Sequence, residues 1–175
     1  MMYPTLYQTT LPSPVGALTL VCNAEQHLVG LWLAGQKYFY GTLSGKPLES
    51  ADLPVFLQTR AWLEAYFAGR RPAASELPPL SPAGSAFRQR VWRILQAIPY
   101  GSTTTYGAIA QQIAAETGKP TMSAQAVGGA VGHNPISILI PCHRVIGADG
   151  SLTGYAGGIP LKAKLLRLEG MALPQ

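Results

Sequence analysis

Residues 141–145 read Pro-Cys-His-Arg-Val, and this stretch says more about the chain than any other. It follows the apolar run Ile136–Ile140, which predicts a buried strand, and it precedes a turn-rich segment at Gly147–Gly150. A thiol beside an imidazole, placed where a buried segment meets a loop, can present an activated nucleophile. The alternative for such a pair alone is that Cys142 is a small buried hydrophobe and His143 only its neighbour.

Length and composition describe a globular protein of one or two domains. The chain has 175 residues, 47% of them hydrophobic, which excludes wholesale disorder and suffices for a sizeable core. No apolar run has the length of a transmembrane helix, and the N-terminus lacks the pattern of a signal peptide. Two cysteines, Cys22 and Cys142, are too few for a disulfide framework. We therefore expect a soluble cytoplasmic protein with no membrane partner, in which Cys142 is a free thiol.

The charge balance is modestly basic, with a formal net charge of +5 and 12% charged residues. This is compatible with a polyanionic partner but does not identify one. The cations gather in two groups, Arg88, Arg90 and Arg93, and Lys162, Lys164 and Arg167. They are either ordinary solvated helix faces or, next to a DNA-reading motif, a surface that faces phosphates.

The first half of the chain predicts strands, one helix and a linker. Residues 5–33 alternate in the manner of strands, with one around residues 18–22 and another at 28–33. Residues 54–68 have helical spacing, and Phe56, Ala61, Leu63 and Phe67 are expected on one broad face. Residues 70–84 are rich in proline and small residues, and we interpret them as a linker between two domains.

The second half predicts four helices. The first follows Ser85 as N-cap and breaks before Pro99, the second covers 105–115, the third covers 123–132, and the last covers 161–168. The third is unusually rich in alanine and glycine. Two helices joined by a Gly/Pro turn are either a helix-turn-helix or an ordinary αα-hairpin, and spacing alone favours the hairpin.

A set of motifs in the second half identifies a family. They are Tyr106, Ala126–Ala130, Asn134-Pro135, Pro141–Val145, Gly154–Gly158 and Leu165–Gly170. Taken together they strongly resemble the O6-alkylguanine-DNA alkyltransferases, also called methylated-DNA–protein-cysteine methyltransferases. The resemblance is close over the second half and weak over the first, where Ser13–Leu18 looks like the family's first strand.

The resemblance implies an α+β fold in two domains. The N-terminal domain, 1–80, would be a ribonuclease-H-like α/β unit. The C-terminal domain, 85–172, would be a mostly helical, winged-helix-like catalytic unit with a helix-turn-helix. Its recognition helix would enter the minor groove of DNA through Ser123, Ala124, Gln125 and Gly128. The small residues agree with this, because a narrow groove admits only a helix with a nearly bare face.

The implied reaction moves an alkyl group from guanine O6 to the sulfur of Cys142. A thiol is mostly protonated at neutral pH, so it needs a base or a stabilising field. By resemblance, His143 accepts the proton through a water and Glu169 orients that imidazole, in the manner of a triad. Asn134 would hold the turn between the recognition helix and the cysteine segment. The thioether product has no route to hydrolysis, so each molecule is expected to react once.

The resemblance also implies how the base is bound. The partner would be double-stranded DNA containing O6-alkylguanine, and the base must leave the stack to reach a buried sulfur. Tyr106 would contact the base edge and crowd the neighbouring phosphate. Tyr155, Ala156 and Gly157 would form the pocket wall, and the carbonyl of Val145 would accept from the exocyclic amine. We expect a monomer without a cofactor, and the cysteines and histidines show no metal-ligand spacing.

Two departures and three alternatives qualify this prediction. Gln125 stands where the family has an arginine that fills the vacated base position, and the connection from Tyr106 to Gln125 is longer than the shorter family pattern.

An alkyltransferase-like protein that only flags lesions would lack Cys142. A sensor that also activates transcription would need a further metal-thiolate domain. A Cys-His hydrolase would turn over an acyl group instead of keeping an alkyl group. The preferred alkyl size and activity on O4-alkylthymine stay open.

Overall fold

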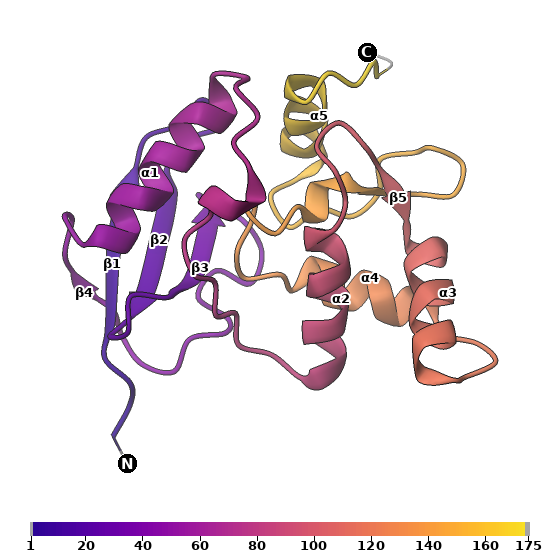
Figure 1. The fold of residues 1–175 in the computed structure, drawn as a ribbon, viewed down its shortest axis with the longest axis horizontal. Helices are drawn as coiled ribbons and strands as arrows, with labels where there is room; N and C mark the ends of the chain where they lie inside the picture. Colours follow the sequence, from indigo (N-terminus) through magenta and orange to yellow (C-terminus); the bar gives the residue numbers. More distant parts are fainter. Residues whose placement is uncertain (1, 174–175) are drawn as a thin grey trace. The chain divides into compact units, whose positions relative to one another are not determined.

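The computed structural model describes residues 2–173, and the chain divides into two compact units (Figure 1). The first unit holds the residues up to Ala83 together with the segment Pro135–Leu139. The second unit holds Gly84–Asn134 and the residues from Ile140 onward. Within the described part of the chain, every helix is too short or too polar to cross a membrane.

The first unit is built on a four-stranded mixed sheet. Strands β1 (Leu6–Leu11), β2 (Leu18–Asn23) and β3 (Leu28–Leu33) form an antiparallel meander, and β4 (Leu48–Glu49) pairs in parallel with β1. The order across the sheet is β3-β2-β1-β4. The predicted strands are therefore confirmed, and the turn between β1 and β2 is closed by a hydrogen bond from the Gly16 N–H to the Ser13 carbonyl.

Helix α1 (Pro54–Phe67) lies across one face of this sheet (Figure 1). Proline at its first position suits a helix start, because the missing N–H would have had no intrahelical partner. Its buried residues are Val55, Phe56, Thr59, Leu63 and Tyr66. Ala61, expected on that face, is exposed instead, and Tyr66 takes the buried position one turn after Leu63.

The prediction of a linker over residues 70–84 is wrong for most of that stretch. It contains the 3-10 helix η1 (Ala74–Glu76), and it then runs alongside the outer edge of β3. The Leu28 N–H donates to the Pro79 carbonyl, and the Ser81 N–H donates to the Leu28 carbonyl, both at 2.8 Å. Proline lacks a donor but keeps its carbonyl, so a proline-rich stretch can still pair with a strand edge as an acceptor.

The prediction of a strand over Ile136–Ile140 is also wrong, although the segment is buried as expected. Only Ile136 pairs with a strand, through a parallel bridge to Leu31 of β3. Ile138 has φ 71°, a left-handed conformation that is unfavourable for a β-branched residue. Prolines at both flanks, Pro135 and Pro141, limit the available donors and conformations, so the apolar run folds into tight turns.

Three helices form the body of the second unit: α2 (Ala86–Gln96), α3 (Tyr106–Thr117) and α4 (Ala124–Gly132). Each begins after a hydroxyl residue, Ser85, Thr105 or Ser123, whose side-chain oxygen accepts a hydrogen bond from a backbone N–H of the first turn. The indole N–H of the fully buried Trp92 donates to the Ala130 carbonyl at 2.9 Å and ties α2 to α4.

The connection between α3 and α4 runs from Gly118 to Ser123 and makes the helix pair of a helix-turn-helix. Gly118 ends α3 in the left-handed conformation, with φ 67°. After α4 come the 3-10 helix η2 (Cys142–Arg144), the short parallel pair of β5 (Thr104–Thr105) with β6 (Val145–Ile146), and α5 (Ile159–Leu168). The predicted fold class, a mixed α/β unit followed by a mostly helical one, is confirmed.

Candidate active site

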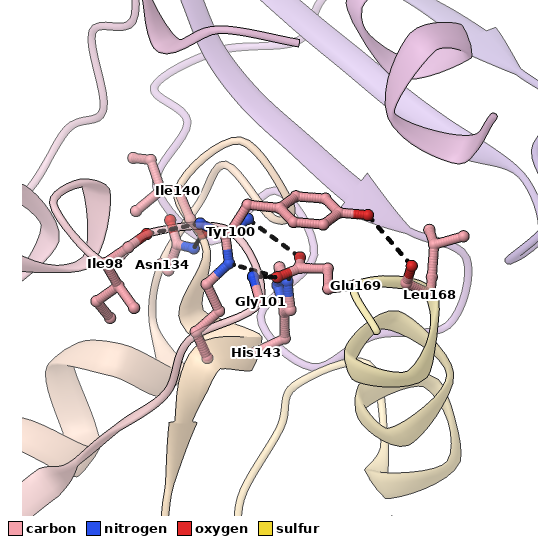
Figure 2. A network of polar contacts seen from close by, with 9 residues as sticks. Ile98, Tyr100, Gly101, Asn134, Ile140, His143, Leu168 and Glu169 are labelled. Carbon is pink, nitrogen blue, oxygen red and sulfur yellow. Dashed lines mark hydrogen bonds and ion pairs between the residues drawn. The ribbon is translucent and has the colours of Figure 1, made fainter. Parts of the chain in front are cut away.

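Cys142 opens the short helix η2 and is 5% exposed. Its N–H donates to the carbonyl of Ile140 at 2.8 Å, and the side-chain amide of Asn134 donates to the same carbonyl at 2.8 Å. Asn134 directly follows the C-cap of α4, so one buried side chain joins the end of that helix to the cysteine segment (Figure 2). This double hydrogen bond fixes the backbone two residues before the sulfur.

His143, the residue after Cys142, forms a fully buried pair with Glu169. The distance from His143 Nε2 to Glu169 Oε2 is 2.6 Å, and both side chains are inaccessible to solvent (Figure 2). A carboxylate only accepts, so Nε2 carries the hydrogen and Nδ1 is left as the acceptor of the neutral ring. Among the described residues, Nδ1 has no hydrogen-bond partner. Burial lowers the pKa of His143, and the hydrogen bond and charge of Glu169 oppose that shift.

Arg144 also binds this carboxylate, which the sequence analysis did not foresee. Its Nε donates to Glu169 Oε1 at 2.8 Å, and its Nη2 donates to Oε2 at 3.1 Å. Its Nη1 donates to the Ile98 carbonyl at 2.7 Å, and the Gly101 N–H donates to Glu169 Oε1 at 3.2 Å. The carboxylate therefore accepts four hydrogen bonds, two of them from a planar fork that suits it.

Lys162 is the second residue that the sequence analysis missed, because it was grouped with surface cations. It is fully buried, and its Nζ donates to the carbonyls of Val145, Thr153 and Gly154. Its pKa falls from 10.5 to about 8, because burial lowers it more than the charge of the nearby Cys142 raises it. The helical spacing held a signal, since Lys162 lies three, four and seven residues before Leu165, Leu166 and Glu169, all of which are buried.

The surroundings of Cys142 act on its thiol in opposite directions. Burial raises the pKa of Cys142, while the hydrogen bond from Asn134 and the charge of Lys162 lower it. A thiol that burial keeps protonated needs a base to become the nucleophile. In the next residue, His143, the buried Nδ1 is an acceptor without a partner in the described chain.

Two of the predicted pocket residues, Tyr106 and Tyr155, lie close enough to Cys142 for its charge to act on them. Tyr155, Ala156 and Gly157 are half-buried in the loop before α5. Burial and the charge of Cys142 both raise the pKa of Tyr155 well above its usual value, and its hydroxyl has no partner among the described residues. The Tyr106 hydroxyl donates to the Thr153 carbonyl at 2.9 Å, which ties the start of α3 to this loop.

The residues predicted to contact DNA lie together on α4. Ser123 caps the helix, and Ala124 and Gln125 are exposed in its first turn. Gly128 is half-buried beside the Tyr106 ring, where an added Cβ would come 3.8 Å from the nearest ring carbon. Helix α4 thus offers an exposed face of small side chains that begins with Gln125 and ends beside Tyr106.

No site in the described residues suits a metal ion. Within residues 2–173, no group of three or more His, Cys, Asp and Glu side chains is arranged to hold one. Both cysteines are free thiols, and Cys22 is buried in β2, where burial raises its pKa to about 11. Cys142, in contrast, lies where the charge of Lys162 lowers the pKa of the thiol and opposes the effect of burial.

Comparison with protein-family models matches both halves of the chain. Residues 6–81 match the ribonuclease-like domain of 6-O-methylguanine DNA methyltransferase, and residues 86–171 match its DNA binding domain. Among curated proteins, the methylated-DNA–protein-cysteine methyltransferase of Haemophilus influenzae is 42% identical over 164 residues, which cover 94% of this chain and 86% of the relative. The protein of the same name from Methanosarcina acetivorans is 42% identical over 94% of this chain and 99% of the relative.

Solved structures give the same result. Mycobacterium tuberculosis O6-methylguanine methyltransferase superimposes with a TM-score of 0.74 at 43% identity, over 97% of this chain and 96% of that one. A structure of Mycobacterium tuberculosis OGT in complex with DNA superimposes with a TM-score of 0.73 at 43% identity, over 93% and 92%.

Proposed function

The chain belongs to the methylated-DNA–protein-cysteine methyltransferase family, and from that premise we propose that it repairs DNA by moving the alkyl group of O6-alkylguanine onto its own Cys142. The observation that carries this proposal is the buried cysteine backed by the His143–Glu169 pair, whose distance is 2.6 Å. A soft sulfur nucleophile suits substitution at carbon, and the buried pair supplies the base that the thiol needs.

The transfer is a displacement at the carbon attached to O6. His143 Nδ1 takes the thiol proton, through a water, while Glu169 accepts from Nε2 and stabilises the imidazolium that forms. The sulfur of Cys142 then forms a bond to the alkyl carbon as the bond from that carbon to O6 breaks. Guanine leaves with the electron pair and takes up a proton, and the protein keeps the alkyl group.

The protein acts once. The product is a thioether, and no hydrolytic group or cofactor motif in the chain can cleave a carbon–sulfur bond. The number of lesions repaired therefore equals the number of protein molecules consumed. This stoichiometry separates the proposal from a Cys-His hydrolase, which would release its acyl group and turn over.

DNA binding is assigned to α4 and the residues around it. Its exposed face of small side chains suits a minor groove, and Gln125 and Tyr106 stand at the two ends of that face. The alkylated base rotates out of the duplex toward Cys142, and Tyr155, Ala156 and Gly157 enclose it. The Val145 carbonyl, which already accepts from Lys162, has a second lone pair for the exocyclic amine.

We take residues 1–80 and 85–172 as the two domains of the protein.

Intact-protein mass spectrometry tests the proposal. The protein is incubated with an excess of a duplex that contains O6-methylguanine, and we expect the mass of one methyl group to be added to each molecule, on Cys142. Cys142→Ser should bind the duplex and gain nothing. Cys22→Ser is the matched control and should be methylated fully, because Cys22 is buried in β2 of the other unit. Methyl on Cys22, or repair of more lesions than there are protein molecules, would overturn the proposal.

A further inference from the structure

Arg144 is a buried cation to which the transfer described above gives no role. It is 8% exposed, and its guanidinium is fixed on three sides. Two nitrogens bind Glu169, the third binds the Ile98 carbonyl, and the group lies 5.8 Å from the centre of the Tyr100 ring. Because each of the three guanidinium nitrogens donates to a group of the same unit, the fork is held by contacts within the protein.

The fork determines how Glu169 meets His143. Oε1 accepts from Arg144 Nε and the Gly101 N–H, whereas Oε2 accepts from Arg144 Nη2 and His143 Nε2. Because both oxygens accept from Arg144, rotation of the carboxylate away from the imidazole would break hydrogen bonds to the fork. The ring in turn keeps its hydrogen on Nε2 and presents Nδ1 as the acceptor.

The charge of Arg144 also opposes that of Glu169. The groups whose charge acts on His143 are Glu169, which favours the protonated ring, and Arg144 and Lys162, which disfavour it. Cys142 is the neighbour whose proton is to be moved, and Tyr155 lies close enough to feel the charge of its thiolate. Burial and Arg144 therefore both lower the pKa of His143, against the raising effect of Glu169.

We propose that Arg144 is a positioning residue for the alkyl transfer, which binds both oxygens of Glu169, holds that carboxylate against His143 and offsets part of its charge. It acts on the imidazole, through Glu169 and through its own charge. The inference rests on the proposed function, because it concerns the base of that reaction.

The titration of the imidazole tests the charge part. In a Cys142→Ser background the ring titrates without its thiol partner, so a single midpoint belongs to His143. The chain has three histidines, and single substitutions of His27 and His133 assign the 15N side-chain signals. Arg144→Gln should raise the midpoint of His143 by roughly one pH unit, as for the loss of a like charge within about 6 Å. Arg144→Lys keeps the charge and should leave the midpoint close to that of the parent.

The transfer rate tests the positioning part in the protein that retains Cys142. Free O6-benzylguanine is the probe, because it needs no DNA binding. Arg144→Lys should slow transfer about tenfold, since it loses one charged hydrogen bond of the fork. Adding Glu169→Gln to Arg144→Lys should slow transfer no further than Glu169→Gln alone. Arg60→Gln, an exposed arginine of the first unit, removes the same formal charge and should transfer at the parental rate.

The outcomes are separable. If the parent gains no methyl from O6-methylguanine in DNA, the proposed function fails, whatever Arg144 does. If the parent reacts but Arg144→Gln leaves the His143 midpoint unchanged, or Arg144→Lys reacts at the parental rate, the inference about Arg144 is wrong. Should Arg144→Gln not fold, Arg144→Met fills the same space for the titration, and the Arg144→Lys rate alone still decides the positioning part.

Discussion

Replacing Lys162 with methionine should change how the stability of the protein depends on pH. The side chain is fully buried, and its pKa falls from 10.5 to about 8 because burial penalises the ammonium. Below pH 8 the amine is charged in both the folded and the unfolded chain, so the folded state bears the whole penalty. At about 1.4 kcal/mol per pH unit, the shift corresponds to a penalty of about 3 kcal/mol.

The sign of the effect follows from the proton count. Between pH 8 and 10.5 the unfolded chain holds a proton on Lys162 that the folded chain has released, so stability rises with pH in this window. Above 10.5 the amine is neutral in both states and the penalty is gone. Methionine carries no charge, so the variant has no such dependence at this position. The substitution also removes the hydrogen bonds to the three carbonyls, and we expect that loss of stability to be the same at every pH.

Urea unfolding from pH 7 to 10.5 measures this effect. The free energy of unfolding of the parent, minus that of Lys162→Met, should rise by about 3 kcal/mol across the range. Both proteins carry Cys142→Ser, which removes the charge that offsets part of the burial effect on Lys162, so the rise should be at least this large. Lys164→Met removes an exposed lysine from the same helix and is the control for the loss of a surface cation. A flat or falling difference for Lys162→Met would refute the charge-burial reasoning.

Two further predictions concern the proposed reaction. Gln125→Ala should slow repair of duplex DNA much more than transfer from free O6-benzylguanine, which needs no base extrusion, and Gln125→Arg should increase duplex affinity most at low salt. Repair of duplex DNA by Gln125→Ala at the parental rate would make Gln125 an ordinary surface residue. Glu169→Gln should slow transfer and raise the apparent pKa of Cys142 in its alkylation by iodoacetamide, because the imidazolium that stabilises the thiolate loses its carboxylate; an unchanged pH–rate profile would remove Glu169 from the mechanism.

Local signals in the sequence predicted the elements well where neighbouring residues decide them. Ser85 and Ser123 mark the starts of α2 and α4 because a cap depends only on the first turn of the helix. The strand at residues 28–33 likewise follows from composition between two turns. The run Ile136–Ile140 was misjudged because its conformation depends on two flanking prolines and on a single partner, Leu31, far away in the chain.

In the candidate site, too, the features that depend on residues far apart in the chain could not be predicted from local signals. The pairing of His143 with Glu169 came from the family motif and not from spacing, because the two residues are 26 positions apart. Arg144 stands inside that motif, yet its role depends on the fold that brings Glu169 and Ile98 to its nitrogens. Lys162 was grouped with exposed cations, although the periodicity of the last helix places it on the buried face. Composition gives the number of lysines and arginines, but it does not say which of them are buried.

The segment Pro135–Leu139 has a consequence for synthesis of the chain. It belongs to the first unit, where Ile136 bridges Leu31 at the outer edge of β3, but it is encoded after the first three helices of the second unit. At roughly 5–20 residues per second, the ribosome makes it several seconds after Ala83. During that interval the nascent sheet keeps this part of β3 unpaired, and an unpaired strand edge is where polypeptides associate wrongly. Completion of the N-terminal unit therefore waits for the translation of the segment that leads into the cysteine.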